Sequence, residues 1–307
     1  MATSFGRRLF STMVTSRPGR TNPSGRHVLW SGAAVVGIFA ACAVAERRRP
    51  TSADPRWRRM RWPADRPARG LVLIEHESVL ERVKRKWDAS SETTRTLTVL
   101  TAANAAVFGL WHVRAPAIRR VLERYFTSRP ESRRIVPHLL SGFSHQSGAH
   151  LAFNMIALWS FGSVVHNTYG REQFCFLYLS SIIASSVFSH VYASRLGRLR
   201  PSLGASGGVL ALVSVCTVLR PDAQLMLIFL PFVSFPAWAA LAGMFAFDTC
   251  GILLGWQMFD HAAHLGGLLA GYLYASKLKD LTWDRRRWLT DRLGVQPARR
   301  PPSSGTY

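Results

Sequence analysis

The chain of 307 residues contains a series of apolar blocks, most of them about as long as a bilayer is thick. They cover residues 28–45, 96–113, 149–168, 173–193, 206–220, 225–247 and 259–276. Inside lipid every backbone polar group needs an internal partner, so segments of this length cross as helices. We therefore predict an all-α, polytopic membrane helix bundle, in which one N-terminal transmembrane helix at 28–45 precedes a six-helix core.

The positive charge lies mostly outside the apolar blocks. The formal net charge of +22 comes from a leader at 1–27, a stretch near 47–69, a loop near 114–134 and the tail after 277. A soluble protein this basic would suggest nucleic acid, but basic segments that flank membrane helices bind anionic headgroups. Trp57 and Trp62 enclose a run of arginines, and this pattern fits interfacial anchoring better than nucleic-acid binding. We expect anionic lipid as a partner and no nucleic acid.

The first 27 residues have the composition of a mitochondrial transit peptide. Arginine is frequent, Ser and Thr lie between the arginines, and Asp and Glu are absent. An ordinary disordered basic tail is the alternative. Residues 46–94 then form a basic extramembrane linker with an amphipathic helix at 72–87, and residues 277–307 form a basic C-terminal tail.

Two segments of the core depart from the simple pattern. Residues 114–148 are too long for a tight turn, and we expect short helices there that lie partly in the membrane interface. Block 225–247 contains Pro231 and Pro236. These predict either a simple kink or a mobile gate helix, because proline frees backbone carbonyls in a membrane helix.

A serine within a glycine-rich turn is the first candidate for chemistry. Gly204, Ala205, Ser206 and Gly207 stand at the start of an apolar block. A lone serine in such a helix usually returns its hydroxyl to the carbonyl four residues back. The glycines favour a different role. They permit a tight turn into the helix and close approach of another backbone, and they leave backbone amides available near the serine oxygen. Ser206 is therefore a candidate nucleophile.

His264 is the second candidate. Gly267 and Gly271 follow it at i+3 and i+7, so it lies on a stripe of small residues where a neighbouring helix can dock closely. A histidine there is either a structural hydrogen-bonding residue or a general base for Ser206. Gly204, Gly207, Gly267 and Gly271 are expected to serve helix packing.

His150 and Asn154 form the third element. Their i, i+4 spacing places an imidazole and a carboxamide on one face of the second core helix. Both groups can donate hydrogen bonds to one point, as an oxyanion hole requires. Taken alone, the pair would instead be a hydrogen-bonded contact between helices. Together with the serine and histidine elements, it favours oxyanion stabilisation.

A metal site is the competing interpretation of the histidines. His261 and His264 lie three residues apart beside Asp260, and His145 with His150 lies near the second core helix. However, the HEXXH motif is absent, no cysteine lies near these histidines, and a metal leaves the Gly-Ala-Ser-Gly turn unexplained. We therefore predict neither a metal nor a cofactor.

Taken together, the turn at 204–207, the pair His150 and Asn154, and the run 263–267 with Gly271 resemble the rhomboid intramembrane serine proteases. Longer strings are similar to the mitochondrial branch of that family, the presenilin-associated rhomboid-like proteases. These strings are 125–128, 158–161, 201–207, 228–231, 254–256 and 259–264. The extra leading helix agrees with the one-plus-six arrangement of that branch.

The resemblance implies a Ser–His dyad without a catalytic acid, in a rhomboid protease domain at 95–276. Ser206 would attack the scissile carbonyl, and His264 would take and return the proton. The Ser206 amide, His150 and Asn154 would hold the oxyanion. The implied substrates are single-pass transmembrane proteins, and the implied location is the mitochondrial inner membrane.

Two positions leave alternatives open. Asp260, four residues before His264, either orients the imidazole or caps the start of the helix. Leu210 stands where bacterial rhomboids often carry a tyrosine that stacks on the catalytic histidine. Either aliphatic packing suffices to orient the ring, or the dyad is less rigid than in those relatives.

Two other functional classes compete with the protease. A non-catalytic rhomboid-like factor for membrane-protein binding or quality control would recognise transmembrane helices without cutting them. Inactive relatives usually lack the serine or the histidine, and both are present here. An ion or metal transporter would require more intramembrane carboxylates than Asp248 and Asp260.

Overall fold

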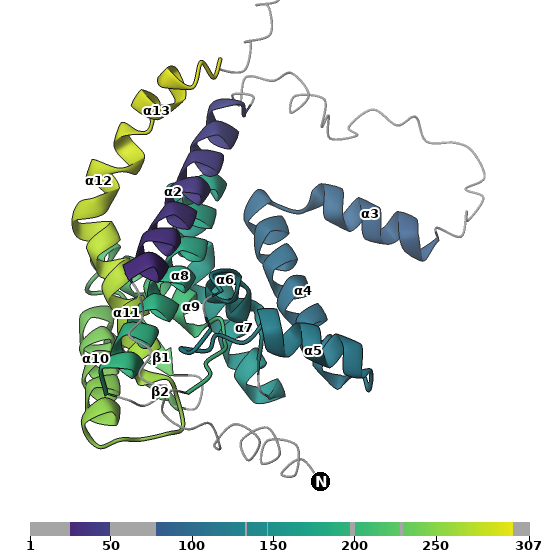
Figure 1. The fold of residues 1–307 in the computed structure, drawn as a ribbon. Helices are drawn as coiled ribbons and strands as arrows, with labels where there is room; N and C mark the ends of the chain where they lie inside the picture. The colour runs from purple at the N-terminus through teal and green to yellow at the C-terminus, as the bar shows by residue number, and fades with distance from the viewer. Residues whose placement is uncertain are drawn as a thin grey trace, which may run out of the picture.

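A computed structural model describes residues 25–49, 78–132, 134–145, 147–196, 200–227 and 230–296. Long helices pack into a bundle (Figure 1). The main ones are α2 (Gly25–Arg47), α4 (Glu92–His112), α7 (Gly148–Tyr169), α8 (Arg171–Leu196), α9 (Ser206–Leu219), α10 (Ala237–Leu253) and α11 (His261–Leu273). The predicted fold class, a helical membrane bundle, is confirmed. The predicted leader falls outside the described residues except for its last three.

Several of these helices can cross a membrane by length and composition. Among the described residues they are His27–Arg47, Gly148–Tyr169 and Arg171–Arg195, and Ser206–Leu219 and Ala237–Leu253 are shorter apolar helices. At 14 residues, α9 is about 21 Å long and thus about 9 Å shorter than the hydrocarbon layer. Because Arg220 follows its last residue, we place that end at the surface. Ser206 is the first residue at the opposite end of this helix.

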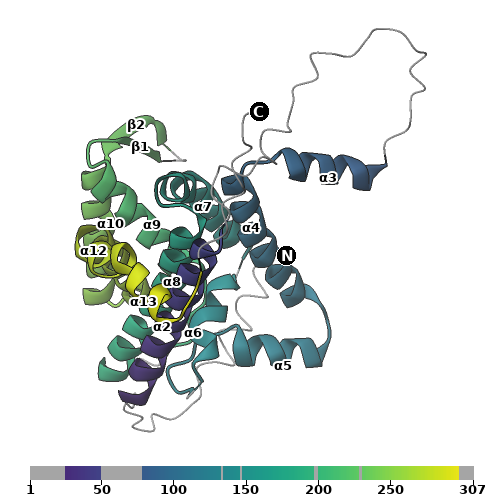
Figure 2. The same ribbon diagram turned by 90° about the horizontal axis from the view of Figure 1, so that it is seen from above.

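Helix α9 forms the centre of the bundle (Figure 2). Helices α7, α8, α10 and α11 all contact it, and almost every side chain from Gly207 to Thr217 is buried. The core around it is built from large apolar side chains of α7 and α8, among them Leu158, Phe174 and Tyr178. A helix that is apolar on all sides is expected in such a central position.

Block 225–247 does not form one helix, so the predicted proline-kinked helix is wrong. Strand β1 (Gln224–Leu227) pairs antiparallel with β2 (Leu230–Pro236), and α10 begins only at Ala237. Pro236 occupies the N-cap position with φ −62° and ψ 145°. Proline lacks the N–H and its ring would collide with the carbonyl of a preceding helical turn. It therefore starts this helix instead of bending it.

Short helices occupy the connection 114–148, as predicted. They are α5 (Pro116–Tyr125), α6 (Val136–Leu140) and the 3₁₀ turn η2 (Ser141–Phe143). The amphipathic linker helix is observed as α3 (Val79–Ala89), which Ser78 and Glu81 start with a capping box. It buries none of its residues, and residues 72–77 of the predicted helix lie outside the described part of the chain.

The predicted basic tail is partly helical and packs on α2 (Figure 1). After a π-helical turn η3 (Tyr274–Leu278) come α12 (Lys279–Leu281), η4 (Trp283–Arg285) and α13 (Arg287–Arg292). Arg286 pairs with Glu46 of α2, and Arg47 Nη2 lies 2.9 Å from Asp291 Oδ1. The extra N-terminal helix is thus held by the C-terminal segment and by α8.

Candidate active site

The turn before α9 places Ser206 beside His150. Gly204 has φ +136°, a region that favours glycine. A Cβ atom built there would lie 2.8 Å from His150 Cε1, 3.0 Å from His150 Nε2 and 3.8 Å from Ser206 Oγ. The Gly204 amide donates to Ser141 O at 2.9 Å, which fixes the turn. The missing side chain of Gly204 therefore makes room for the imidazole next to the serine.

Helices α9 and α11 meet backbone to backbone. A Cβ on Gly267 would overlap the backbone oxygen of Gly207, and a Cβ on Gly271 would overlap that of Ala211. Ser206 directly precedes Gly207, and His264 lies about one turn before Gly267. The seam therefore brings both residues to the same end of the helix pair. Among the described residues no hydrogen bond joins them, and such bonds often tighten only when substrate is bound.

A buried carboxylate, which the sequence analysis did not assign to the site, contacts His264. Asp248 of α10 is 3% exposed. Its Oδ1 atom lies 3.1 Å from His264 Nδ1 and 2.6 Å from His261 Nδ1. A histidine that donates from Nδ1 keeps the lone pair of Nε2 free to act as a base. The sequence held a signal for Asp248, because it directly follows apolar block 225–247 and an ionisable residue in a membrane helix is by default a functional candidate.

Of the two interpretations of Asp260, the structure shows the cap. Its Oδ1 accepts the amide of Ala263 at 2.9 Å, and its Oδ2 accepts the hydroxyl of Ser189 at 2.6 Å. Ser185, one turn earlier in α8, donates to Ala263 O at 2.7 Å. Asp260 thus holds the start of α11 against α8, while the carboxylate that contacts His264 comes from α10.

The two predicted oxyanion donors differ in their surroundings. His150 borders the Gly204 turn as described, and its amide donates to Ser147 Oγ at 3.2 Å. The Asn154 amide group, 6% exposed, donates from Nδ2 to His150 O at 2.8 Å within its own helix. One of its two N–H groups is therefore already used by the backbone.

His145 is a further neighbour of this turn. The Ala205 amide donates to His145 Nε2 at 3.5 Å, and the ring centroids of His145 and His150 are 4.9 Å apart. Burial, together with the neighbouring His150, lowers the pKa of His145 to about 3. His145 therefore stays neutral and supports the turn as a hydrogen-bond acceptor.

An aromatic ring does lie against His264, although it does not come from position 210. The Phe259 ring centroid is 5.9 Å from that of His264, with 33° between the planes. Phe259 belongs to the loop before α11, whereas Leu210 is a partly buried residue of α9. The loop thus supplies the aromatic contact that bacterial rhomboids often take from the helix.

The residues around Asp248 also form the group that could hold a metal ion among the residues that the structure describes. Asp248, His261 and His264 each offer a ligand atom, and these atoms lie within 4.8 Å of one another. Two imidazoles and a carboxylate match a zinc donor set. However, both Nδ1 atoms already lie at hydrogen-bond distance from Asp248 Oδ1. Direct hydrogen bonds account for the cluster, so the geometry requires no ion.

Comparison with known proteins adds the family. Residues 132–280 match the model of the rhomboid domain. The chain is 46% identical over 208 residues to the mouse protein named presenilin-associated rhomboid-like protein, mitochondrial, a match that covers 67% of this chain and 54% of that protein. It is 40% identical over 178 residues to Rhomboid protein 1, mitochondrial, of Saccharomyces cerevisiae, with 57% of this chain and 51% of that protein covered. The chain thus spans about half the length of the curated relatives it matches.

Proposed function

The chain belongs to the rhomboid family, and on that premise we propose that it is an intramembrane serine endopeptidase that cleaves single-pass transmembrane proteins in the mitochondrial inner membrane. The carrying observation is the close seam between α9 and α11, which places Ser206 and His264 at one end of two packed helices. The relatives are named as mitochondrial proteins, in agreement with the basic leader predicted from the sequence.

In the proposed mechanism Ser206 Oγ attacks the scissile carbonyl while His264 Nε2 takes the hydroxyl proton. His264 then gives that proton to the leaving amine, and a water molecule, activated by the same base, releases the acyl group. The contact with Asp248 supports this assignment, because a carboxylate at Nδ1 selects the required tautomer and stabilises the imidazolium that forms. Asp248 would act as a positioning residue.

The oxyanion of the tetrahedral intermediate would be held at the start of α9. Ser206 is the first residue of the helix, so its amide has no partner within the helix. The imidazole of His150 lies beside the same turn. The second N–H of Asn154 would be a further donor, although the first is bound to the backbone. Donors arranged in advance of the reaction lower the barrier without reorganisation.

The depth of Ser206 supports membrane-embedded substrates. A helix about 9 Å too short to span the hydrocarbon layer leaves its first residue below the surface. A scissile bond inside a transmembrane segment could thus reach the serine. Anionic lipid would contact the basic flanks, including α3, which exposes Val79, Leu80 and Val83 beside its charged residues.

The second candidate function is non-catalytic binding of membrane proteins. The occupied Asn154 donor and the missing Ser206–His264 hydrogen bond also fit a non-catalytic rhomboid-like factor that binds membrane proteins. Labelling with a serine-reactive fluorophosphonate separates the two functions, because only an activated serine reacts.

The test uses the purified full-length chain in detergent or lipid nanodiscs with a single-pass substrate. We expect the wild type to be labelled by the probe and to cleave the substrate. Ser206→Ala and His264→Ala should do neither, although their Tm should equal that of the wild type. Ser214→Ala is the matched control, because Ser214 is a buried serine two turns further along α9. Substantial cleavage by Ser206→Ala would overturn the assignment, and an unlabelled, inactive wild type would support the binding factor.

A further inference from the structure

The contact between α10 and α11 has the composition of a metal site, a property that the proposed mechanism does not use. Asp248, His261 and His264 each offer a ligand atom, and these atoms lie within 4.8 Å of one another. Asp248 is 3% exposed and His261 4% exposed, whereas the side chain of His264 is 17% exposed. An ion would therefore reach this group past His264, the imidazole of the proposed base.

The ligand atoms are spaced nearly as they are around a zinc ion. Zn–N bonds of about 2.0–2.1 Å and tetrahedral angles place two ligand atoms about 3.3 Å apart. Asp248 Oδ1 lies 2.6 Å from His261 Nδ1 and 3.1 Å from His264 Nδ1. These distances would have to grow by about 0.7 and 0.2 Å, which small side-chain rotations can supply. Two imidazoles, one carboxylate and a water molecule in the fourth position form a donor set found in zinc enzymes.

His261 is held in place by packing, while its tautomer is left open. The ring centroids of Phe247 and Phe259 lie 5.6 and 6.0 Å from that of His261. Its Nε2 atom is buried and has no hydrogen-bond partner among the described residues. No contact at Nε2 therefore fixes the ring proton at Nδ1, and the proton can move to Nε2 when a cation takes the Nδ1 lone pair. The group can thus change from a hydrogen-bonded to a metal-bound form with little movement.

We propose that Asp248, His261 and His264 bind one divalent transition-metal cation of the Zn²⁺ type, and that the bound ion reversibly inhibits the protease. Imidazole nitrogens suit Zn²⁺, Cu²⁺ or Ni²⁺, whereas Mg²⁺ and Ca²⁺ require oxygen ligands. The ion is an inhibitor and not a cofactor, because hydrogen bonds alone complete the group without it. Metal binding stands on its own, whereas the inhibition rests on the proposed function.

The inhibition follows from the tautomer of His264. In the proposed mechanism, Nδ1 of this ring donates its proton to Asp248, and Nε2 keeps a lone pair for the hydroxyl of Ser206. A cation that binds Nδ1 releases that proton to water, and Nε2 takes up a proton from water. The ring stays neutral, but it no longer has a lone pair that can accept the serine proton.

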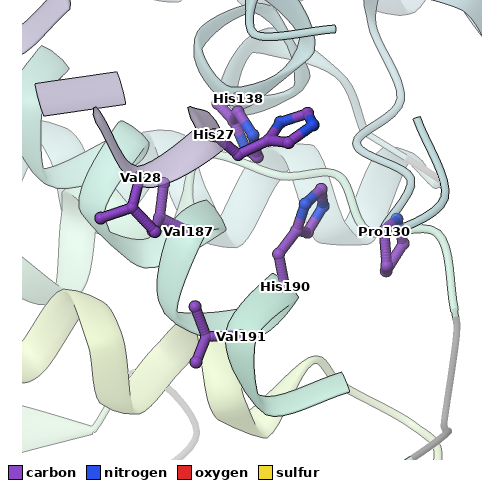
Figure 3. Close-up of a pocket in the computed structure, with 7 residues that line it drawn as sticks. All are labelled: His27, Val28, Pro130, His138, Val187, His190 and Val191. Carbon is purple, nitrogen blue, oxygen red and sulfur yellow. The ribbon is translucent and has the colours of Figure 1, made fainter. Parts of the chain in front are cut away.

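A second group of buried histidines supplies the control. His27, His138 and His190 line a small cavity together with apolar side chains of valine and proline (Figure 3). His138 Nδ1 lies 2.8 Å from Ser186 Oγ, so a hydroxyl group takes the place of the carboxylate. The residues that line this cavity include no carboxylate and do not form a metal donor set. His138→Asn therefore removes a buried imidazole and leaves the Asp248 group intact.

Metal binding is measured first on the full-length Ser206→Ala protein, because Ser206 is not a ligand and proteolysis is then excluded. After chelator treatment, Zn²⁺ affinity is determined by competition against a chromophoric chelator, and bound Co²⁺ by its visible spectrum. We expect one tetrahedral Co²⁺ ion per chain and a Zn²⁺-dependent rise in Tm. Loss of a hydrogen-bond partner of a metal ligand costs about 10–100-fold in affinity. Adding His261→Asn, which removes a ligand itself, should cost more than about 100-fold, whereas His138→Asn should leave the affinity unchanged.

X-ray absorption of the Zn²⁺-loaded wild type covers the case in which a histidine variant does not fold. It should show two imidazoles per zinc ion, and a site with only oxygen or sulfur ligands would overturn the proposal. Equal Co²⁺ bands with and without His261→Asn, or loss of the bands in His138→Asn, would overturn it as well.

Inhibition is then measured as cleavage of a single-pass substrate by the wild type. Zn²⁺ should abolish cleavage, and a chelator should restore it. Compared with its own rate without metal, His261→Asn should require more than about 100-fold more Zn²⁺ for inhibition, while His138→Asn should behave like the wild type. Cleavage that persists at Zn²⁺ concentrations that saturate the Ser206→Ala protein would refute the inhibition. A wild type that binds Zn²⁺ and cleaves nothing would instead overturn the proposed function and leave the metal site in place.

Discussion

Gly267→Ala adds one methyl group where α9 and α11 are in backbone contact. The new Cβ would lie 2.9 Å from Gly207 Cα and closer still to the Gly207 oxygen. Because carbon atoms pack best at about 3.5–4.0 Å, the helices would have to separate by about 1 Å. Backbone atoms cannot turn aside as a flexible side chain can. The strain is therefore expected to move the two helix ends that carry Ser206 and His264.

The expected effects on stability and on rate differ in size. Overpacking costs about 1–3 kcal/mol, while alanine in place of glycine returns about 1 kcal/mol of helix propensity. The net loss of stability is thus about 0–2 kcal/mol. A displacement of catalytic atoms by about 1 Å can cost about 10²-fold in rate. Turnover should therefore fall about 10²-fold in a protein that still folds, and Gly267→Leu should be worse in both respects.

The assay compares kcat for a single-pass substrate with Tm in the same detergent. Gly243→Ala is the control, since a Cβ at that exposed position of α10 meets no atom within 4 Å. We expect the control to keep wild-type turnover. If Gly267→Ala also kept normal turnover and normal Tm, the seam would not position the active site, and the packing argument would have to be abandoned.

Three further predictions follow from individual contacts. Asp248→Asn should lower kcat by about 10²-fold or more with little change in KM, since the carboxylate acts on the ring of His264; an unchanged kcat would remove Asp248 from the site. His150→Ala should lower kcat by about 10–10³-fold and Asn154→Ala by less, because one Asn154 donor is already used; a rise in KM alone would make either residue structural. His138 should contribute up to about 3 kcal/mol to the loss of unfolding free energy between pH 6.5 and pH 4, because burial holds its pKa at about 4 and only the unfolded chain gains the proton in that range; His138→Asn should make the slope shallower by that amount in urea titrations, while buried His145 keeps a slope of the same sign.

The sequence predicts helices well where apolar blocks end at clear signals. Block 149–168 corresponds to Gly148–Tyr169, because Ser147 caps the start and Gly170 with φ +82° follows the end. Block 225–247 was misassigned because a continuous apolar run has no period that separates strand from helix. Its prolines were the better signal, since Pro236 marks the start of α10.

The candidate site was predictable only where its parts are local in sequence. The Gly204 turn, the glycine stripe after His264 and the i, i+4 pair all have a pattern within a few residues. Asp248 has no local sequence pattern that links it to His264, because their contact depends on how α10 is placed against α11. Asp260 was the nearer carboxylate along the chain, but its position as N-cap directs it to the Ala263 amide.

The contact between α10 and α11 explains how a carboxylate is tolerated inside this bundle. Helix α10 buries few residues, and these are Ala237, Asp248 and Gly251. A Cβ on Gly251 would lie 2.5 Å from three atoms of the His261 ring, so the missing side chain admits that imidazole. His261 and His264 then both present Nδ1 to one oxygen of Asp248. Two donors compensate the desolvated charge, while the same contact holds an otherwise loosely packed helix against α11. Orientation of His264 and attachment of α10 are therefore one interaction, and a substitution at Asp248 should loosen α10 as well as slow the chemistry.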